Sequence, residues 1–289
     1  MLRHLLLICL ILCACPATLS AAEPAAAPTA PEASASASGE AASAADSTAA
    51  PESQPATPVV SAAASTDPEE YWQAEDWQAH GETTKVGEQV TLLHKSEQGF
   101  RLGLAVLLPD WQQVADLLPL SQRLNALGFD TLIMLPSPRQ LTLDPNAEQD
   151  QLAIQAFRES WQLRLTALME NNSGSGGYTL LVAAGSSAAW LGGLLSSQTL
   201  AAPDGLVLID AFYPATDANQ ILARDIAGLP CPVLDLYRSG QVSWLDQAVR
   251  ERALAVKRQN KLDWRQLALQ TRDERGDQLA GWLNFLGWK

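Results

Sequence analysis

The hydroxyls of Ser186 and Ser187 have the clearest chemical potential in this chain, because they directly follow an apolar segment. That segment, 178–184, reads Tyr-Thr-Leu-Leu-Val-Ala-Ala, and Gly185 stands between it and the serines. A serine on a sharp turn between a strand and a helix is exposed for nucleophilic attack. It attacks only if a neighbouring base removes its proton. His94 is the last histidine of the chain, so no imidazole follows the serines.

This turn can be aligned in two ways with the pattern Gly-x-nucleophile-x-Gly. In the first alignment Gly185 takes the nucleophile position, and no hydroxyl is available for attack. In the second, Ser187 becomes the nucleophile and Ala189 replaces the last glycine. Ser186 is the other candidate nucleophile. The structural alternative is that the hydroxyls only cap the N-terminus of the following helix.

Alternating strand and helix patterns surround the turn. Several expected strands are continuous apolar runs, typical of a parallel sheet buried on both faces; the strands are 88–94, 100–108, 130–135, 179–184, 205–209, 232–237 and 264–270. Helices are expected over 120–127, 154–168, 186–195, 243–259 and 277–285, with a short one over 69–84. The first of these has Pro119 near its start and Gly128 just past its end, the usual asymmetry of helix ends. The connection after Ile209 should hold at most a short helix, so any lid is small.

This alternation predicts an α/β fold with a doubly wound, mostly parallel sheet and right-handed crossovers. Ligands of such sheets bind beyond the carboxyl ends of the strands. The expected pocket is therefore framed by residues that follow or end the strands, namely Pro109, Asp110, Trp111, Gly185, Ser186, Asp210, Tyr213 and Tyr237. For Asp110, capping of the following turn is an equal alternative.

Several short motifs occur in a fixed order along the chain. They are 106–111 (Val-Leu-Leu-Pro-Asp-Trp), 183–190 (Ala-Ala-Gly-Ser-Ser-Ala-Ala-Trp), 204–210 (Asp-Gly-Leu-Val-Leu-Ile-Asp), 232–237 (Pro-Val-Leu-Asp-Leu-Tyr), Asn260 with 264–266 (Trp-Arg-Gln), and 281–283 (Gly-Trp-Leu). Together they resemble a family of exported bacterial proteins of unknown function with an α/β-hydrolase-like fold, over roughly residues 85–285. The resemblance implies a sheet of the α/β-hydrolase type and an exported location, and no established activity.

Three groups that hydrolases of this fold use are missing from the sequence. The acid commonly follows the strand 232–237, where the turn reads Arg-Ser-Gly-Gln, and the base should follow 264–270, where the chain continues Thr-Arg-Asp-Glu-Arg. Pro109 lacks the N–H that an oxyanion loop requires, and Asp110 would oppose a developing negative charge. We therefore expect a protein without a catalytic triad that binds a small molecule or an envelope protein.

The rival hypothesis is a serine esterase-type hydrolase with a non-standard base. Its nucleophile is Ser187 or Ser186, and its base is His80, His94 or a carboxylate such as Asp210. The two histidines could reach the serines only if the segment that contains them folds over the sheet.

The N-terminal 22 residues are typical of a secretory signal. An apolar run over 5–15 is too short to span a bilayer, and the small residues 20–22 predict cleavage after Ala22. A lipoprotein signal with its lipid on Cys15 is the alternative, which Pro16 fits poorly. We expect an exported, periplasmic protein with no transmembrane segment after signal removal.

Composition divides the rest of the chain. Residues 23–67 are rich in Ala, Pro and Ser and hold no aromatic residue, so they are expected to form a disordered linker before a domain over 68–289. The net charge of −13 argues against nucleic acid as a partner. Cys231 alone remains after cleavage, which excludes an internal disulfide. With two mature histidines and one cysteine, neither a metal site nor a cofactor is expected.

Overall fold

The computed structural model describes residues 77–86, 89–111, 113–137, 139–144, 147, 150–172 and 176–289. All of them belong to the unit that spans Val60–Lys289. The expected signal peptide, the linker and most of the helix expected over 69–84 lie outside the described residues.

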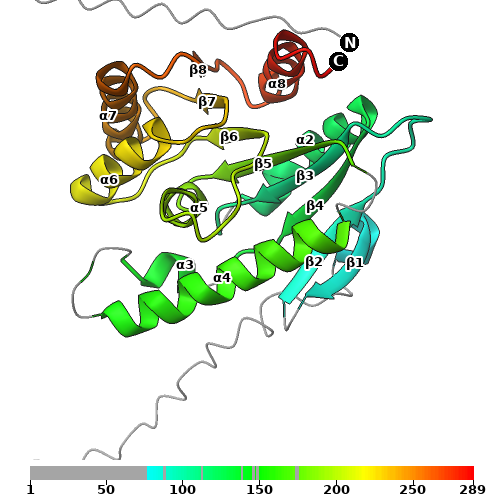
Figure 1. Ribbon diagram of the computed structural model, residues 1–289, viewed down its shortest axis with the longest axis horizontal. Helices are drawn as coiled ribbons and strands as arrows, with labels where there is room; N and C mark the ends of the chain where they lie inside the picture. Colours follow the sequence, from blue (N-terminus) through cyan, green and yellow to red (C-terminus); the bar gives the residue numbers. More distant parts are fainter. Residues whose placement is uncertain are drawn as a thin grey trace, which may run out of the picture. The chain divides into compact units, whose positions relative to one another are not determined.

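An eight-stranded sheet organises this unit (Figure 1). In chain order the strands are β1 (Glu82–Val86), β2 (Gln89–His94), β3 (Gly103–Leu108), β4 (Phe129–Met134), β5 (Tyr178–Ala184), β6 (Gly205–Ile209), β7 (Val233–Tyr237) and β8 (Trp264–Ala268). Across the sheet their order is β1-β2-β4-β3-β5-β6-β7-β8. The pairs β1–β2 and β2–β4 are antiparallel and the others are parallel. The predicted mostly parallel sheet of α/β-hydrolase type is confirmed.

Helices connect the parallel strands. After the short 3-10 helix η2 (Gln78–His80) come α2 (Val114–Leu127), α3 (Arg139–Thr142), α4 (Gln151–Asn172), α5 (Ser187–Ser196), α6 (Thr216–Ala227), α7 (Ser243–Gln259) and α8 (Glu274–Phe285). Gly128 ends α2 with φ +103°, a left-handed conformation that suits glycine. Because α2 begins at Val114, Pro119 lies inside the helix instead of at its start.

Two expectations about local structure are wrong. Residues 82–84 belong to strand β1, not to a helix, because Thr83 and Thr84 pair with β2 at the edge of the sheet, a setting that favours β-branched residues. The connection after Ile209 holds α6, a helix of 12 residues rather than a short one. Its large apolar contacts are few: Leu222 and Ile226, one helical turn apart, pack against the core. Such a narrow stripe is easily missed in the sequence.

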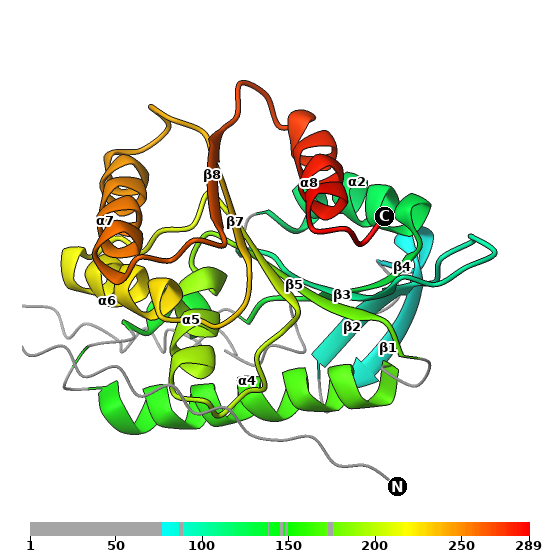
Figure 2. The same ribbon diagram turned by 45° about the horizontal axis from the view of Figure 1, so that its top comes forward.

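The helices form layers on both faces of the sheet (Figure 2). Alternate residues of one strand point to opposite faces. On β3, Leu104, Val106 and Leu108 therefore join the core under α4, α5 and α6, whereas Ala105 and Leu107 join the core under α2 and α8. Both faces are apolar, which explains the continuous apolar runs of the sequence.

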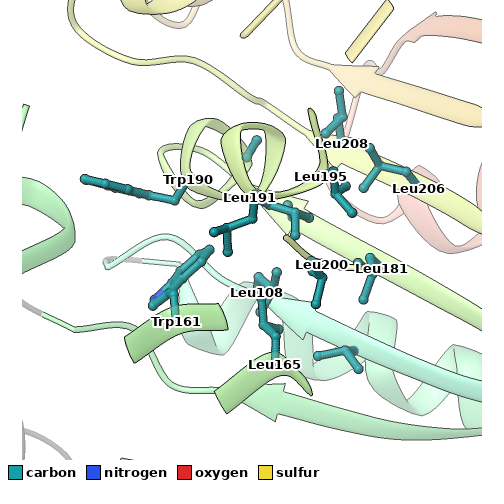
Figure 3. Packing of buried hydrophobic residues seen from close by; sticks show 14 of the residues in the cluster. Leu108, Trp161, Leu165, Leu181, Trp190, Leu191, Leu195, Leu200, Leu206 and Leu208 are labelled. Carbon is teal, nitrogen blue, oxygen red and sulfur yellow. The ribbon is translucent and has the colours of Figure 1, made fainter. Parts of the chain in front are cut away.

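Figure 3 shows the packing on the α4–α5 face of the sheet. Trp161 and Leu165 of α4 meet Leu191 of α5 above Leu108 and Leu181 of the strands, and all five are buried. This packing fixes the position of α5, and with it the turn that precedes α5. Among the described residues, no helix has both the length and the apolar character needed to cross a membrane.

Candidate functional site

The parallel strands bring the predicted site loops together at one edge of the sheet. Leu108 of β3 pairs with Ala183 of β5, and Ile209 of β6 pairs with Ala184 of β5 and Leu236 of β7. Backbone bonds continue this pairing past the strands, because the Gly185 N–H donates to the Ile209 carbonyl at 3.0 Å. The residues after β3, β5, β6 and β7 therefore line a common carboxyl edge, as predicted.

The turn between β5 and α5 is made by Gly185, which has φ +52°. A Cβ atom on Gly185 would lie 2.0 Å from Oδ2 of Asp110, far inside van der Waals contact. The sharp turn at which a nucleophile would stand is thus occupied by glycine, which fits the first of the two alignments. The space for a side chain at this turn is filled by the carboxylate of Asp110.

The carboxylate of Asp110 binds the start of α5. Its Oδ1 accepts a hydrogen bond from the Ser186 Oγ at 2.7 Å and one from the Trp111 N–H at 2.8 Å. Its Oδ2 accepts the Ser186 N–H at 3.3 Å. A negative charge is favourable at a helix N-terminus. Asp110 is therefore an anion that belongs to the protein and sits at the N-terminus of α5.

Ser187 is the first residue of α5 and is fully buried. Its Oγ donates to the Pro109 carbonyl at 2.6 Å and accepts a hydrogen bond from the Gln140 side chain. The Gln140 amide also donates to the Ser186 Oγ at 3.3 Å. Neither serine hydroxyl caps α5: Ser186 occupies the N-cap position but makes no side-chain cap bond. The capping alternative is wrong because Asp110 takes the Ser186 hydroxyl instead.

Tyr213 lies in the loop after β6, within electrostatic reach of Asp110. Its hydroxyl donates to the Leu143 carbonyl, and its N–H donates to Asn219 Oδ1 at 2.8 Å. Burial raises the pKa of Tyr213 to about 12, with further contributions from the charges of Asp144 and Asp110. The Tyr213 phenol is therefore neutral at physiological pH and acts as a hydrogen-bond donor.

A second cluster forms around Asp210, which follows β6 with φ +46°. Arg238, just after β7, donates to the Asp210 carboxylate from its backbone N–H at 2.8 Å, from Nε at 3.0 Å and from Nη2 at 2.9 Å. Nη2 of Arg275, from the first turn of α8, donates to Asp210 Oδ2 at 3.0 Å. Arg238 thus follows β7, the strand after which a hydrolase commonly has its acid. Arg275 follows β8, the strand after which a hydrolase commonly has its histidine.

A buried ion pair supports the loop after Asp210. Asp235 lies within β7 and is completely buried, and its carboxylate accepts hydrogen bonds from Arg252 of α7 at 2.9 and 3.0 Å. Arg252 Nη1 also donates to the Ala211 carbonyl at 2.6 Å. The pair connects α7, β7 and the Asp210 loop, so it holds that loop in place.

The histidines of the rival hypothesis lie elsewhere. His94 ends β2 and pairs with Thr131 near the amino end of β4, away from the carboxyl edge. Its Nδ1 lies 2.6 Å from the Ser121 Oγ, and its Nε2 contacts the His80 carbonyl. The described residues therefore bring neither imidazole to Ser186 or Ser187.

The remaining predicted pocket residues are Trp111 and Tyr237. Trp111 is half-buried and donates its N–H to Asp110, and Tyr237 is half-buried at the carboxyl end of β7. Sequence reasoning did not select Gln140, Arg238 or Arg275 for this edge. For the two arginines a signal was present, because they stand in the turns that lack the expected acid and base. Gln140 offers no such signal.

The fold is that of the α/β-hydrolases, as comparison with solved structures shows. A proposed carboxylesterase from Lactobacillus plantarum WCFS1 superposes with a TM-score of 0.51 at 10% identity, over 72% of this chain and 97% of that one. The esterase domain of a Rhodothermus marinus protein gives 0.47 at 11% identity, over 68% and 92%. Est1E from Butyrivibrio proteoclasticus gives 0.46 at 10% identity, over 71% and 96%. At these identities the likeness concerns the fold alone.

Residues 143–284 match the model of a family described as "Protein of unknown function (DUF3530)". This match confirms the resemblance to an uncharacterised family that the motifs indicated. No curated protein matches the sequence.

Proposed function

We propose that this protein is an α/β-hydrolase-fold protein that lacks a catalytic triad and binds a ligand or a partner at the carboxyl edge of its sheet. The observation that carries the proposal is the contact between Gly185 and Asp110. A carboxylate fills the space that the side chain of a nucleophile would need.

The charges at the elbow, the turn over 185–187 between β5 and α5, support the same function. A hydrolase stabilises a developing oxyanion with N–H groups at this turn. Here the Ser186 N–H donates to the Asp110 carboxylate. A substrate oxyanion would meet an existing negative charge and a donor that is already engaged, so its formation is not stabilised.

The groups that stand where the acid and the base are expected cannot replace them. Arg238 and Arg275 carry guanidinium groups, which have donors but no acceptor. Neither can remove a proton from a hydroxyl. Both are bound to Asp210, and this engages the other carboxylate that the rival hypothesis considered.

One observation favours the rival, a serine hydrolase that uses Ser186. The Ser186 Oγ lies 2.7 Å from Asp110 Oδ1, within reach of a general base. A carboxylate is a much weaker base than an imidazole, and the same Asp110 opposes an oxyanion. The binding function is therefore the better supported of the two.

The proposal includes export to the periplasm, which the signal-like residues 1–22 support. The ligand there is a small molecule or an envelope protein. Nucleic acid does not suit a chain with a net charge of −13.

Turnover of short-chain p-nitrophenyl esters by the purified mature chain tests this function. Wild type, Ser186→Ala and Ser187→Ala are expected to give the same rate as buffer with an inert protein. Turnover by wild type that either serine variant abolishes would establish the rival instead.

A further inference from the structure

The two arginines at the carboxyl edge carry more positive charge than the carboxylate that they bind. Both Arg238 and Arg275 donate to Asp210, and the three side chains are 15%, 3% and 4% exposed, respectively. Asp210 is thus the one carboxylate to which these two arginines donate hydrogen bonds among the described residues, and Asp116 adds a negative charge near Arg275 without such a bond. A buried charge without full compensation is unfavourable. An additional anion at this place would therefore stabilise the fold.

Arg275 also has donors without acceptors. Its Nη2 binds Asp210, whereas its Nε and Nη1 are buried and have no hydrogen-bond partner within the part of the chain that the structure describes. Burial lowers the pKa of the Arg275 guanidinium, and the charge of Asp210 opposes that shift. Arginine stays protonated in proteins, so the unmet donors belong to a cation.

A cavity of about 460 Å³ lies beside Arg275, between α2 and the start of α8. Figure 2 shows these two helices next to each other on one face of the sheet. The charged residues of its lining are Arg123, Arg272, Arg275, Asp116, Asp273 and Asp277. Two ion pairs use four of them: Arg272 binds Asp116 at 2.7 Å, and Arg123 binds Asp277 at 3.0 Å. Asp273 is exposed at the rim, and Arg275 remains as the cation with free donors.

We propose that this cavity binds one small acidic group, a carboxylate or a phosphate, through the guanidinium of Arg275. The inference rests on the proposed function and deepens it, since it names the class of ligand that the carboxyl edge recognises. The planar fork of arginine matches such groups with two parallel hydrogen bonds.

Two features define the ligand further. The free nitrogens of Arg275 have almost no contact with solvent, so binding in the proposed mode requires the guanidinium to turn toward the cavity. The carboxylates of Asp116, Asp273 and Asp277 surround the opening. They repel a polyanion, so the ligand presents a single acidic group.

Calorimetric titration of the full mature chain with sodium acetate, and separately with inorganic phosphate, tests the proposal. Binding of one of them at millimolar concentrations is expected, and the arm that binds identifies the acidic group. Arg275→Met should abolish the binding. Asp210→Asn should strengthen it about tenfold, because it removes a negative charge beside the guanidinium. Lys95→Gln, which removes one positive charge from the exposed pair with Glu82 and does not line this cavity, is the matched control and should change affinity less than twofold.

Failure of both anions to bind the folded wild type would overturn the proposal and leave water as the partner of Arg275. Weaker binding by Asp210→Asn would overturn it as well. Arg275→Lys, which keeps the charge and loses the planar fork, decides the matter if the other two variants do not fold: it should bind the anion more weakly than wild type, and unchanged binding would overturn the proposal. Ester turnover at the elbow would instead contradict the proposed function. The two failures are thus distinguishable.

Discussion

The clusters around Asp110 and Asp210 lie at the same edge of the sheet, yet different groups bind the carboxylate in each. Asp110 is half-buried and is bound by a serine hydroxyl, two backbone N–H groups and the start of α5, with no cation among these contacts. Asp210 is buried and is held by two guanidinium groups. The first cluster is closed on itself. The second leaves two donors of Arg275 without partners, so it is the part of the edge at which we propose that a ligand binds.

The comparison predicts that the two aspartates differ in their contribution to stability. Asp210→Ala leaves Arg238 and Arg275 buried without a counter-charge and should lower the free energy of unfolding by about 3–5 kcal/mol. Asp110→Ala removes only hydrogen bonds and should cost about 1–3 kcal/mol. Urea denaturation of both variants measures the difference. Equal losses would show that the surplus charge of the second cluster has no energetic weight.

Filling the elbow tests whether Asp110 excludes a side chain there. Gly185→Ala adds a Cβ against Asp110 at a residue with φ +52° and should cost about 2–4 kcal/mol in the free energy of unfolding. In an Asp110→Gly background, Gly185→Ala should cost at most half of what it costs in wild type, because the steric conflict is gone and only the left-handed backbone remains unfavourable. Additive losses in this double-mutant cycle would contradict the account of the elbow.

The two serines of the turn, Ser186 and Ser187, are both buried, but their hydrogen-bond partners differ in burial. Ser187→Ala leaves the Pro109 carbonyl and the Gln140 amide without their buried partner and should cost about 1–2 kcal/mol. Ser186→Ala removes one bond to a half-buried carboxylate and should cost less than Ser187→Ala. Thermal unfolding of the two variants measures which serine contributes more to stability. A larger loss for Ser186→Ala would contradict this prediction.

Titration of Tyr213 gives the smallest expected effect. Its pKa in the folded protein, about 12, lies above the ordinary value of 10.0. The neutral phenol therefore stabilises the fold fully below pH 10, and this contribution is lost as the pH rises through 12. The difference in phenolate absorbance between wild type and Tyr213→Phe should appear near pH 12 while circular dichroism shows a folded chain. Asp110→Asn should lower that midpoint, because the charge of Asp110 contributes to the shift. A midpoint near pH 10 in the folded wild type would show that the phenol is not buried as described.

Much of this architecture could be predicted from sequence, because strands buried on both faces leave continuous apolar runs such as 179–184. The length of α6 was not predicted because Leu222 and Ile226 are the only large apolar residues among its buried side chains. At the elbow, composition left two alignments open. The positive φ of Gly185 and its contact with Asp110 decide between them, and both arise from the pairing of β3 with β5 across 75 positions of sequence.

The second cluster was only half visible in the sequence. The absence of an acid after β7 and of a histidine after β8 could be read directly, whereas the use of Arg238 and Arg275 could not. Arg275 meets Asp210 across 65 positions of sequence, and no local pattern announces such a contact. Gln140 belongs to a four-residue helix, too short for any periodic signal.

Treatment of the mature chain with a fluorophosphonate, followed by intact-protein mass spectrometry, tests most directly whether the elbow holds a working nucleophile. The account predicts that the mass of the folded protein stays unchanged, since glycine occupies the turn and Asp110 fills the space in front of it. An added mass of one phosphonyl group, absent from Ser186→Ala or Ser187→Ala, would contradict it.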